Sequence, residues 1–174
     1  APDINTDDRV MAWLMDTVSM MRDEETTGSV TGKPLSLGGS LGHVGATANG
    51  VVTCVRAAFE QHGWDLVGPR VSIQGFGKVG GPLAYLLHSA GMRVVAIADV
   101  TGAVTNPGGI DVPALGEFVK QSGGVVGFDG GEDITAEEFW QVSCDLMVPA
   151  ALALAIDENI AEKLDTKIVV EAAN

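Results

Sequence analysis

Hydrophobic residues near the N-terminus recur with the spacing of an amphipathic helix. They fall at i, i+3, i+4, i+7, i+8 and i+11, on one face of a 3.6-residue period: Val10, Trp13, Leu14, Thr17, Val18 and Met21. We expect a helix that Thr6 caps and that ends near Arg22. A glycine-rich connection over 28–50 leads into a second expected helix over 47–62, for which Gly63 is a plausible stop.

From residue 70 the pattern changes to short apolar runs that alternate with amphipathic stretches. Strands are expected over 71–74, 93–99, 123–128, 145–148 and 167–171, and helices over 78–90, 111–121, 135–138 and 157–164. Such alternation is typical of an α/β fold with a doubly wound parallel sheet. We therefore expect a leading part, 1–69, and a Rossmann-like core, 70–174. The chain stops soon after a buried-type strand, so we expect a fragment of a longer protein.

Composition narrows the class of protein. Of 174 residues 46% are hydrophobic, which argues against disorder, and the net charge of −13 argues against a nucleic-acid partner. No apolar run has the length of a membrane span. The three histidines are too scattered for a metal site, and Cys54 and Cys144 form no disulfide framework, so we expect a reducing, cytoplasmic environment without a metal.

A glycine motif follows the strand expected over 71–74. Gly75-Phe76-Gly77-Lys78-Val79-Gly80 has the form G-x-G-x-x-G, an amphipathic helix follows it, and an acid ends the next strand. In a dinucleotide site the three glycines permit a tight turn, a close approach of backbone to pyrophosphate, and close helix–sheet packing. Free N–H groups at the helix start would face the phosphates. The alternative is a turn that needs glycine for steric reasons alone.

The acid at the end of the second core strand bears on the choice of cofactor. Asp99 stands where a carboxylate would accept hydrogen bonds from a ribose 2′-OH and repel a 2′-phosphate. Neither Arg nor Lys occurs in residues 100–103, which favours NAD over NADP, and Val100 joins the expected cofactor-binding set. Lys78 either adds charge near the pyrophosphate or points to water.

Several longer motifs carry a resemblance to a known family. They are Ala1-Pro2-Asp3-Ile4-Asn5-Thr6, Met11-Ala12-Trp13, Val30-Thr31-Gly32-Lys33-Pro34-Leu35, Gly38-Gly39-Ser40-Leu41-Gly42, Ala46-Thr47, Gln74-Gly75-Phe76-Gly77, Asn106-Pro107, Val148-Pro149-Ala150-Ala151 and Val169-Val170-Glu171. On these residues the chain resembles the cofactor-binding half of the glutamate dehydrogenase family, which includes leucine, phenylalanine and valine dehydrogenases. The opening motif favours glutamate, because the leucine and phenylalanine enzymes lack it.

The resemblance implies a reaction and roles for particular residues. The reaction is reversible oxidative deamination of L-glutamate to 2-oxoglutarate and ammonia, with hydride transfer to nicotinamide in a homohexamer. Asp3 matches the family's catalytic proton carrier. Thr47 matches a threonine near nicotinamide and substrate, Ala150 and Ala151 match small residues beside the cofactor riboses, and Asn174 matches an asparagine at the nicotinamide ribose.

Other features keep alternatives open. His43, Gly45 and Ala48 stand where the family carries arginine, glutamate and glycine, and loss of a guanidinium weakens any carboxylate clamp there. The family's catalytic lysine and part of its substrate site have no counterpart in this chain, so we expect the chain alone to bind cofactor without turnover. The alternatives are a non-catalytic dinucleotide sensor or paralogue, and a dehydrogenase of another amino acid.

Overall fold

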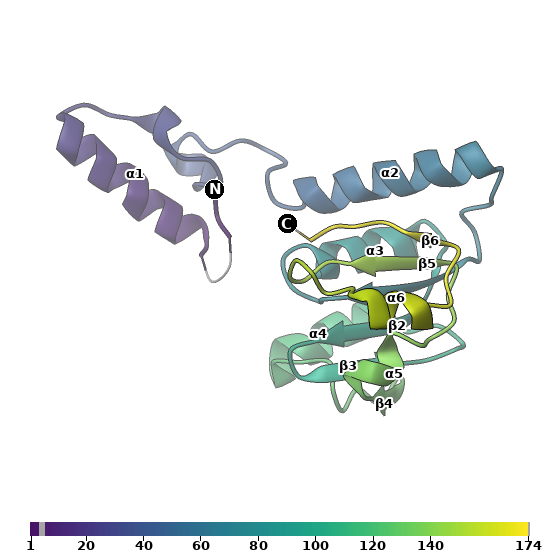
Figure 1. Ribbon diagram of the computed structural model, residues 1–174. Helices are drawn as coiled ribbons and strands as arrows, with labels where there is room; N and C mark the ends of the chain where they lie inside the picture. Colours follow the sequence, from purple (N-terminus) through teal and green to yellow (C-terminus); the bar gives the residue numbers. More distant parts are fainter. Residues whose placement is uncertain (4–5, 174) are drawn as a thin grey trace. The chain divides into compact units, whose positions relative to one another are not determined.

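The computed structural model describes residues 1–3 and 6–173, which form two compact units (Figure 1). The first unit is Ala1–Ala46 and the second is Thr47–Asn174. The compact units therefore part at residue 46, and the division into a leading part, 1–69, and a Rossmann-like core, 70–174, stays a prediction. Isoleucine and asparagine of the opening motif, at positions 4 and 5, lie outside the described residues.

The first unit is built on the helix α1 (Asp8–Arg22), as the periodicity predicts. The predicted cap is wrong, because Asp7 rather than Thr6 accepts a hydrogen bond from the Val10 N–H at 3.0 Å. The Thr6 hydroxyl instead accepts from the backbone N–H of Asp3 at 2.6 Å. A carboxylate at the N-cap also suits the positive end of the helix dipole.

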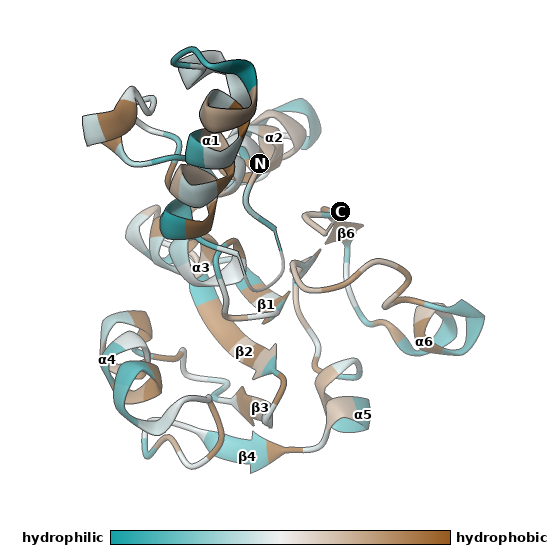
Figure 2. Ribbon diagram, turned by 90° about the vertical axis from the view of Figure 1, so that its left-hand side faces the viewer, coloured by the Kyte–Doolittle hydropathy of each residue, from teal (hydrophilic) through white to brown (hydrophobic). Residues whose placement is uncertain are grey.

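The apolar surface of α1 is only partly buried. Met11 is 2% exposed and Met15 is also buried, whereas Trp13 is 63% and Met21 is 83% exposed. Figure 2 shows the resulting brown and teal bands along this helix. The glycine-rich connection that follows contains two short 3₁₀ turns, η1 (Thr27–Ser29) and η2 (Leu35–Leu37).

The second unit contains a mixed six-stranded sheet in the order β4-β3-β2-β1-β5-β6. The strands are β1 (Arg70–Gln74), β2 (Arg93–Asp99), β3 (Gly102–Thr105), β4 (Glu132–Ile134), β5 (Leu146–Pro149) and β6 (Ile168–Val169). The strands β2, β1, β5 and β6 run parallel, whereas β3 and β4 pair antiparallel. The prediction of a parallel sheet is thus right for its central part and wrong for one edge.

The strand predicted over 123–128 does not exist. Gly123 and Gly127 adopt a φ of +85°, a conformation that breaks a strand. The N–H of Val125 donates to the side chain of Asp99 instead of to a neighbouring strand. The sheet edge is formed by β3 and β4, whose short runs of three or four residues give little periodic signal.

Helices cover both faces of the sheet. α2 (Ala46–His62), α3 (Gly80–Ser89) and α4 (Val112–Ser122) contribute to one hydrophobic cluster, and α5 (Ala136–Phe139) and α6 (Glu158–Lys163) flank the other (Figure 1). The predicted helices are confirmed to within about two residues. Asp111, Asp157 and the pair Thr135–Glu138 cap α4, α6 and α5 as their sequence positions predict.

A bulge in β2 decides which side chains face each layer. Val71 of β1 pairs with Val94, but Ser72 pairs with Ala96, so Val95 is the extra residue. Val95 and Ala96 consequently both pack in the cluster beside α5, while Val94 and Ile97 pack in the cluster beside α3. Residues 94–98 are all buried although they are all apolar, and the strand is accordingly brown over most of its length in Figure 2.

The carboxyl end of β1 is the point where the connections of the sheet diverge. The chain leaves β1 through α3 to β2 on one side, and later returns through α5 to β5 on the other side. Crevices at such switch points are the preferred ligand sites of open α/β sheets.

The amino ends of the parallel strands are joined by an ion cluster around Asp145. Its Oδ2 accepts from the Arg70 N–H at 2.8 Å, and its Oδ1 lies 2.9 Å from the Lys167 ammonium. Burial raises the pKa of Asp145, but the hydrogen bonds and the two cations together lower that pKa below its ordinary value. The carboxylate therefore stabilises the folded state most when it is ionised.

We predict that Asp145→Asn lowers the free energy of unfolding by about 1 kcal/mol at pH 7, a modest value because Arg70 and Lys167 are partly exposed. Since the folded pKa is depressed, the wild-type advantage is complete above the unfolded pKa of about 4 and disappears as pH falls through the folded value. Urea unfolding of both proteins from pH 7 down to acid measures this. Asp129→Asn, at an exposed position, is the control, and a difference independent of pH would contradict the prediction.

Candidate functional site

The turn after β1 requires glycine at its first position. Gly75 has a φ of +101°, and its N–H donates to the Ala98 carbonyl of β2 at 2.6 Å. A Cβ atom on Gly75 would lie 2.7 Å from the carbonyl oxygen of Ala150 and 3.2 Å from the Cβ of Ala151. The segment after β5 therefore packs directly against the turn, which leaves no room for a side chain.

The third glycine lets α3 begin close to the sheet. A Cβ on Gly80 would collide with the carbonyl oxygen of Gly75 and would lie 3.6 Å from the Cβ of Ala150. Gly77 has the opposite environment, because it is exposed and an added Cβ would meet no atom within 4 Å. Two glycines of the motif are thus required by the fold, whereas the middle one leaves an open approach to the backbone.

The N-terminus of α3 beside this turn has no side-chain cap. Val79 occupies the N-cap position, and no hydrogen bond to another described residue is found for the N–H groups of Phe76, Gly77 or Val79. By contrast, α1, α4, α5 and α6 are each capped by Asp or Thr. Unused N–H donors and the positive end of a helix dipole favour an anionic group here. Lys78 is exposed beside them.

A buried acceptor lies at the base of the same turn. The Oε1 atom of Gln74, at the end of β1, is shielded from solvent and has no hydrogen-bond partner among the described residues. Such orphaned acceptors are rare and call for a donor from water or a ligand. Together with the open backbone at Gly77, this observation fits a polar ligand bound at the carboxyl end of β1.

Asp99 lies at the end of the adjacent strand, β2, but much of its carboxylate is already engaged. Oδ1 accepts from the N–H and the hydroxyl of Thr101 at 2.8 and 2.6 Å, and Oδ2 accepts from the Val125 N–H at 3.0 Å. A carboxylate offers about four lone-pair positions, so one position on Oδ2 is left for a ligand hydroxyl. Val100, which follows, is fully exposed.

The structure brings part of the predicted set together. The glycine turn contacts Ala150 and Ala151, and Ala98 connects that turn to the end of β2 where Asp99 and Val100 lie. Thr47 is exposed near the start of α2, with no hydrogen bond to the turn among the described residues. Asn174 lies outside the described residues.

The predicted catalytic residue belongs to the first unit. Asp3 is exposed and is held by the backbone hydrogen bond to Thr6. A Cβ on Gly32 would collide with the ring of Pro2 and would lie 2.8 Å from Nε2 of His43, so these three residues lie together. His43 is therefore close to the opening motif that contains Asp3.

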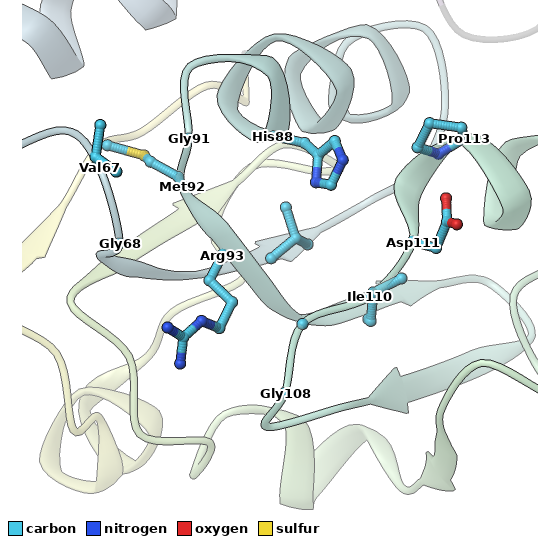
Figure 3. Close-up of a pocket in the computed structure, with 12 residues that line it drawn as sticks. Val67, Gly68, His88, Gly91, Met92, Arg93, Gly108, Ile110, Asp111 and Pro113 are labelled. Carbon is cyan, nitrogen blue, oxygen red and sulfur yellow. The ribbon is translucent and has the colours of Figure 1, made fainter.

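An open groove of about 800 Å³ lies elsewhere in the second unit (Figure 3). It is lined by residues at the amino ends of β1 and β2, including Gly68 and Arg93, and by the segment that leads into α4. His88 and Asp111 border it without an ion pair between them. Among the residues that the structure describes, none of the predicted site residues lines this groove, so volume alone does not locate the site.

Sequence reasoning missed Thr101 and the Val125 N–H, which hold Asp99. The Asp-x-Thr spacing was a usable signal, because Asp side chains commonly accept a hydrogen bond from the N–H two residues on. The contact with Val125 spans 26 residues and carried no local signal.

None of the helices in residues 1–3 and 6–173 has the length and apolar composition needed to cross a membrane. Within the same residues, no three side chains of His, Cys, Asp or Glu gather as a metal site requires.

The fold and the glycine turn define a mixed α/β protein with a candidate anion site at a sheet switch point. The sequence profile of the Glutamate/Leucine/Phenylalanine/Valine dehydrogenases matches residues 38–174, and the chain belongs to this family. It is 43% identical over its whole length to the catabolic NAD-specific glutamate dehydrogenase RocG of Bacillus subtilis and 42% identical to the NADP-specific glutamate dehydrogenase A1 of Halobacterium salinarum.

Solved structures give the same result. The hetero-hexameric glutamate dehydrogenase of Thermus thermophilus, in its leucine-bound form, superposes with a TM-score of 0.92 at 38% identity, over 99% of this chain. The chain spans 41% of that protein and 41% of the Bacillus protein. The likeness therefore covers the whole chain but less than half of each relative.

We predict that alanine has unequal effects on stability at two glycines of the turn. Gly80→Ala should lower the free energy of unfolding by about 3 kcal/mol, since the Cβ meets the rigid backbone of Gly75. Gly77→Ala should change it by less than about 0.5 kcal/mol. Urea unfolding followed by tryptophan fluorescence compares the two, and equal effects would show that the turn is packed differently.

Proposed function

We propose that this chain is the NAD(P)-binding part of a glutamate dehydrogenase. The observation that carries the proposal is the glycine turn at the carboxyl end of β1, where packing requires Gly75 and Gly80 but leaves Gly77 open above uncapped N–H groups. Family membership and the glutamate dehydrogenases among the relatives support the reaction class. The proposed reaction is reversible oxidative deamination of L-glutamate to 2-oxoglutarate and ammonia.

The cofactor would be held by backbone more than by side chains. Unused N–H groups at Phe76, Gly77 and Val79 would donate to the pyrophosphate, and Lys78 would add positive charge nearby. Ala150 and Ala151 would pass beside the riboses, because their small side chains leave the turn accessible. The bound nicotinamide supplies reversible hydride transfer.

Asp99 is the residue proposed to determine whether this chain prefers NAD or NADP. Its free position on Oδ2 would accept a ribose 2′-OH, while its charge would repel a 2′-phosphate. Both NAD-specific and NADP-specific enzymes occur among the relatives, so NAD is the narrower proposal. Thr47 and Asn174 complete the proposed set on the resemblance alone.

Proton transfer is proposed for Asp3, an exposed carboxylate next to Pro2. A positioned carboxylate can carry protons while the imine and carbinolamine form and break down. The family's catalytic lysine has no counterpart here, so we propose that the chain alone binds cofactor and does not turn over. We further propose a cytoplasmic homohexamer for the full-length protein.

Titration calorimetry of this chain tests the cofactor site. NADH should bind at micromolar to sub-millimolar concentration and NADPH at least about tenfold more weakly. Gly77→Ala should weaken NADH binding by at least about tenfold, since its Cβ enters the space that a phosphate would use, while leaving stability unchanged. Gly28→Ala, where an added Cβ also meets open space, is the matched control. Equal NADH binding by wild type and Gly77→Ala would refute the proposed phosphate site.

The catalytic proposal is tested in a full-length protein that contains this segment. Asp3→Asn should lower kcat for glutamate deamination by about 10²–10⁴-fold and leave the NADH dissociation constant unchanged. Asp8→Asn, at the first residue of α1, is the control for a lost carboxylate nearby. A protein that binds NADH but oxidises no amino acid would instead be a sensor, and preference for another amino acid would correct the substrate.

A further inference from the structure

The carboxylate of Asp99 is fixed by a second segment of the chain. The segments 99–102 and 123–127 interlock where two glycines make room for side chains. A Cβ on Gly124 would collide with the side chain of Thr101, and a Cβ on Gly102 would lie 2.7 Å from Val126. Thr101 therefore sits in a tight contact although it is exposed on its outer side.

Thr101 makes the shortest hydrogen bond to this carboxylate. Its hydroxyl donates to Oδ1 of Asp99 at 2.6 Å, and its backbone N–H donates to the same oxygen at 2.8 Å. The Val125 N–H, from a residue that is fully buried, holds Oδ2 at 3.0 Å. Three donors from two segments leave the carboxylate a single orientation, with one acceptor position on Oδ2 open.

We propose that Thr101 is a positioning residue that determines cofactor selectivity through Asp99, an inference that rests on the proposed cofactor site. The hydroxyl and the N–H of Thr101 fill Oδ1, so the remaining acceptor position lies on Oδ2, where a ribose hydroxyl would donate. Without the hydroxyl the charge and the two backbone N–H donors remain, but one of three hydrogen bonds is lost and an acceptor position opens on Oδ1. A carboxylate held by two donors instead of three is less well oriented for the ribose of NADH and can move further from the 2′-phosphate of NADPH.

Thr101→Val is the informative change, because valine keeps the branched shape against Gly124 and leaves Asp99 in place. Thr101→Ser keeps the hydroxyl and is the rescue variant. Thr53→Val removes an exposed hydroxyl from α2 that donates only to the Asn49 carbonyl, and it is the matched control. Dissociation constants for NADH and NADPH are measured by calorimetry on all four proteins, with urea unfolding as a check of folding.

In Thr101→Val we expect the NADH dissociation constant to rise about three- to tenfold and that of NADPH to stay the same or fall, since one charge-assisted hydrogen bond is lost. Thr101→Ser and Thr53→Val should keep the wild-type ratio. An unchanged ratio in Thr101→Val, or an equal loss for both cofactors, would overturn the inference and leave Thr101 a structural residue. Failure of wild type to bind NADH would refute the cofactor site itself, and the inference with it.

Discussion

The close approach of three backbone segments at the carboxyl end of β1 is the contact on which the rest of the second unit depends. The Gly75 turn, the start of α3 at Gly80 and the Ala150 segment after β5 meet with no space for a Cβ at either glycine. This contact fixes how α3 leaves the sheet and where β5 ends beside β1. Packing would therefore require Gly75 and Gly80 even in a protein that binds no ligand. Gly77 is the glycine of the motif that packing does not require, so a substitution there distinguishes a ligand-binding turn from a purely structural one.

The polar groups around this contact are arranged asymmetrically. At the amino ends of the strands, Asp145 is paired with Arg70 and Lys167, so charge there is neutralised within the fold. At the carboxyl ends, N–H donors of the turn and the Oε1 atom of Gln74 lack partners among the described residues. Buried or aligned polar groups without partners are costly in a folded protein, and they persist where function compensates for them.

Local signals along the chain predicted most of the helices and the central strands. Capping depends on residues close together in sequence, so Asp111 and Asp157 could be predicted to begin helices. The continuous apolar run of β2 likewise predicted a buried strand. The edge strands β3 and β4 were missed because their pairing is decided by contacts across the sheet. The contacts of Asp99 with Val125 could not be foreseen either, since two glycines bend a predicted strand into a loop. The glycine motif was correctly predicted to form a turn. Which of its glycines are required by packing, and which one stays accessible, depends on contacts with Ala150 that only the three-dimensional structure shows.

The bulge at Val95 has a consequence for how this protein can change in evolution. Side chains of a strand alternate between faces, and Val95 is the residue of β2 that stands outside this alternation. Without it, Val94, Ala96 and Ile97 would alternate regularly between the two clusters and keep their partners in β1. A lineage descended from this chain could therefore lose one residue at the bulge and keep Ile97 and Asp99 on their present faces, whereas a deletion in a strand without a bulge turns every later side chain to the other face.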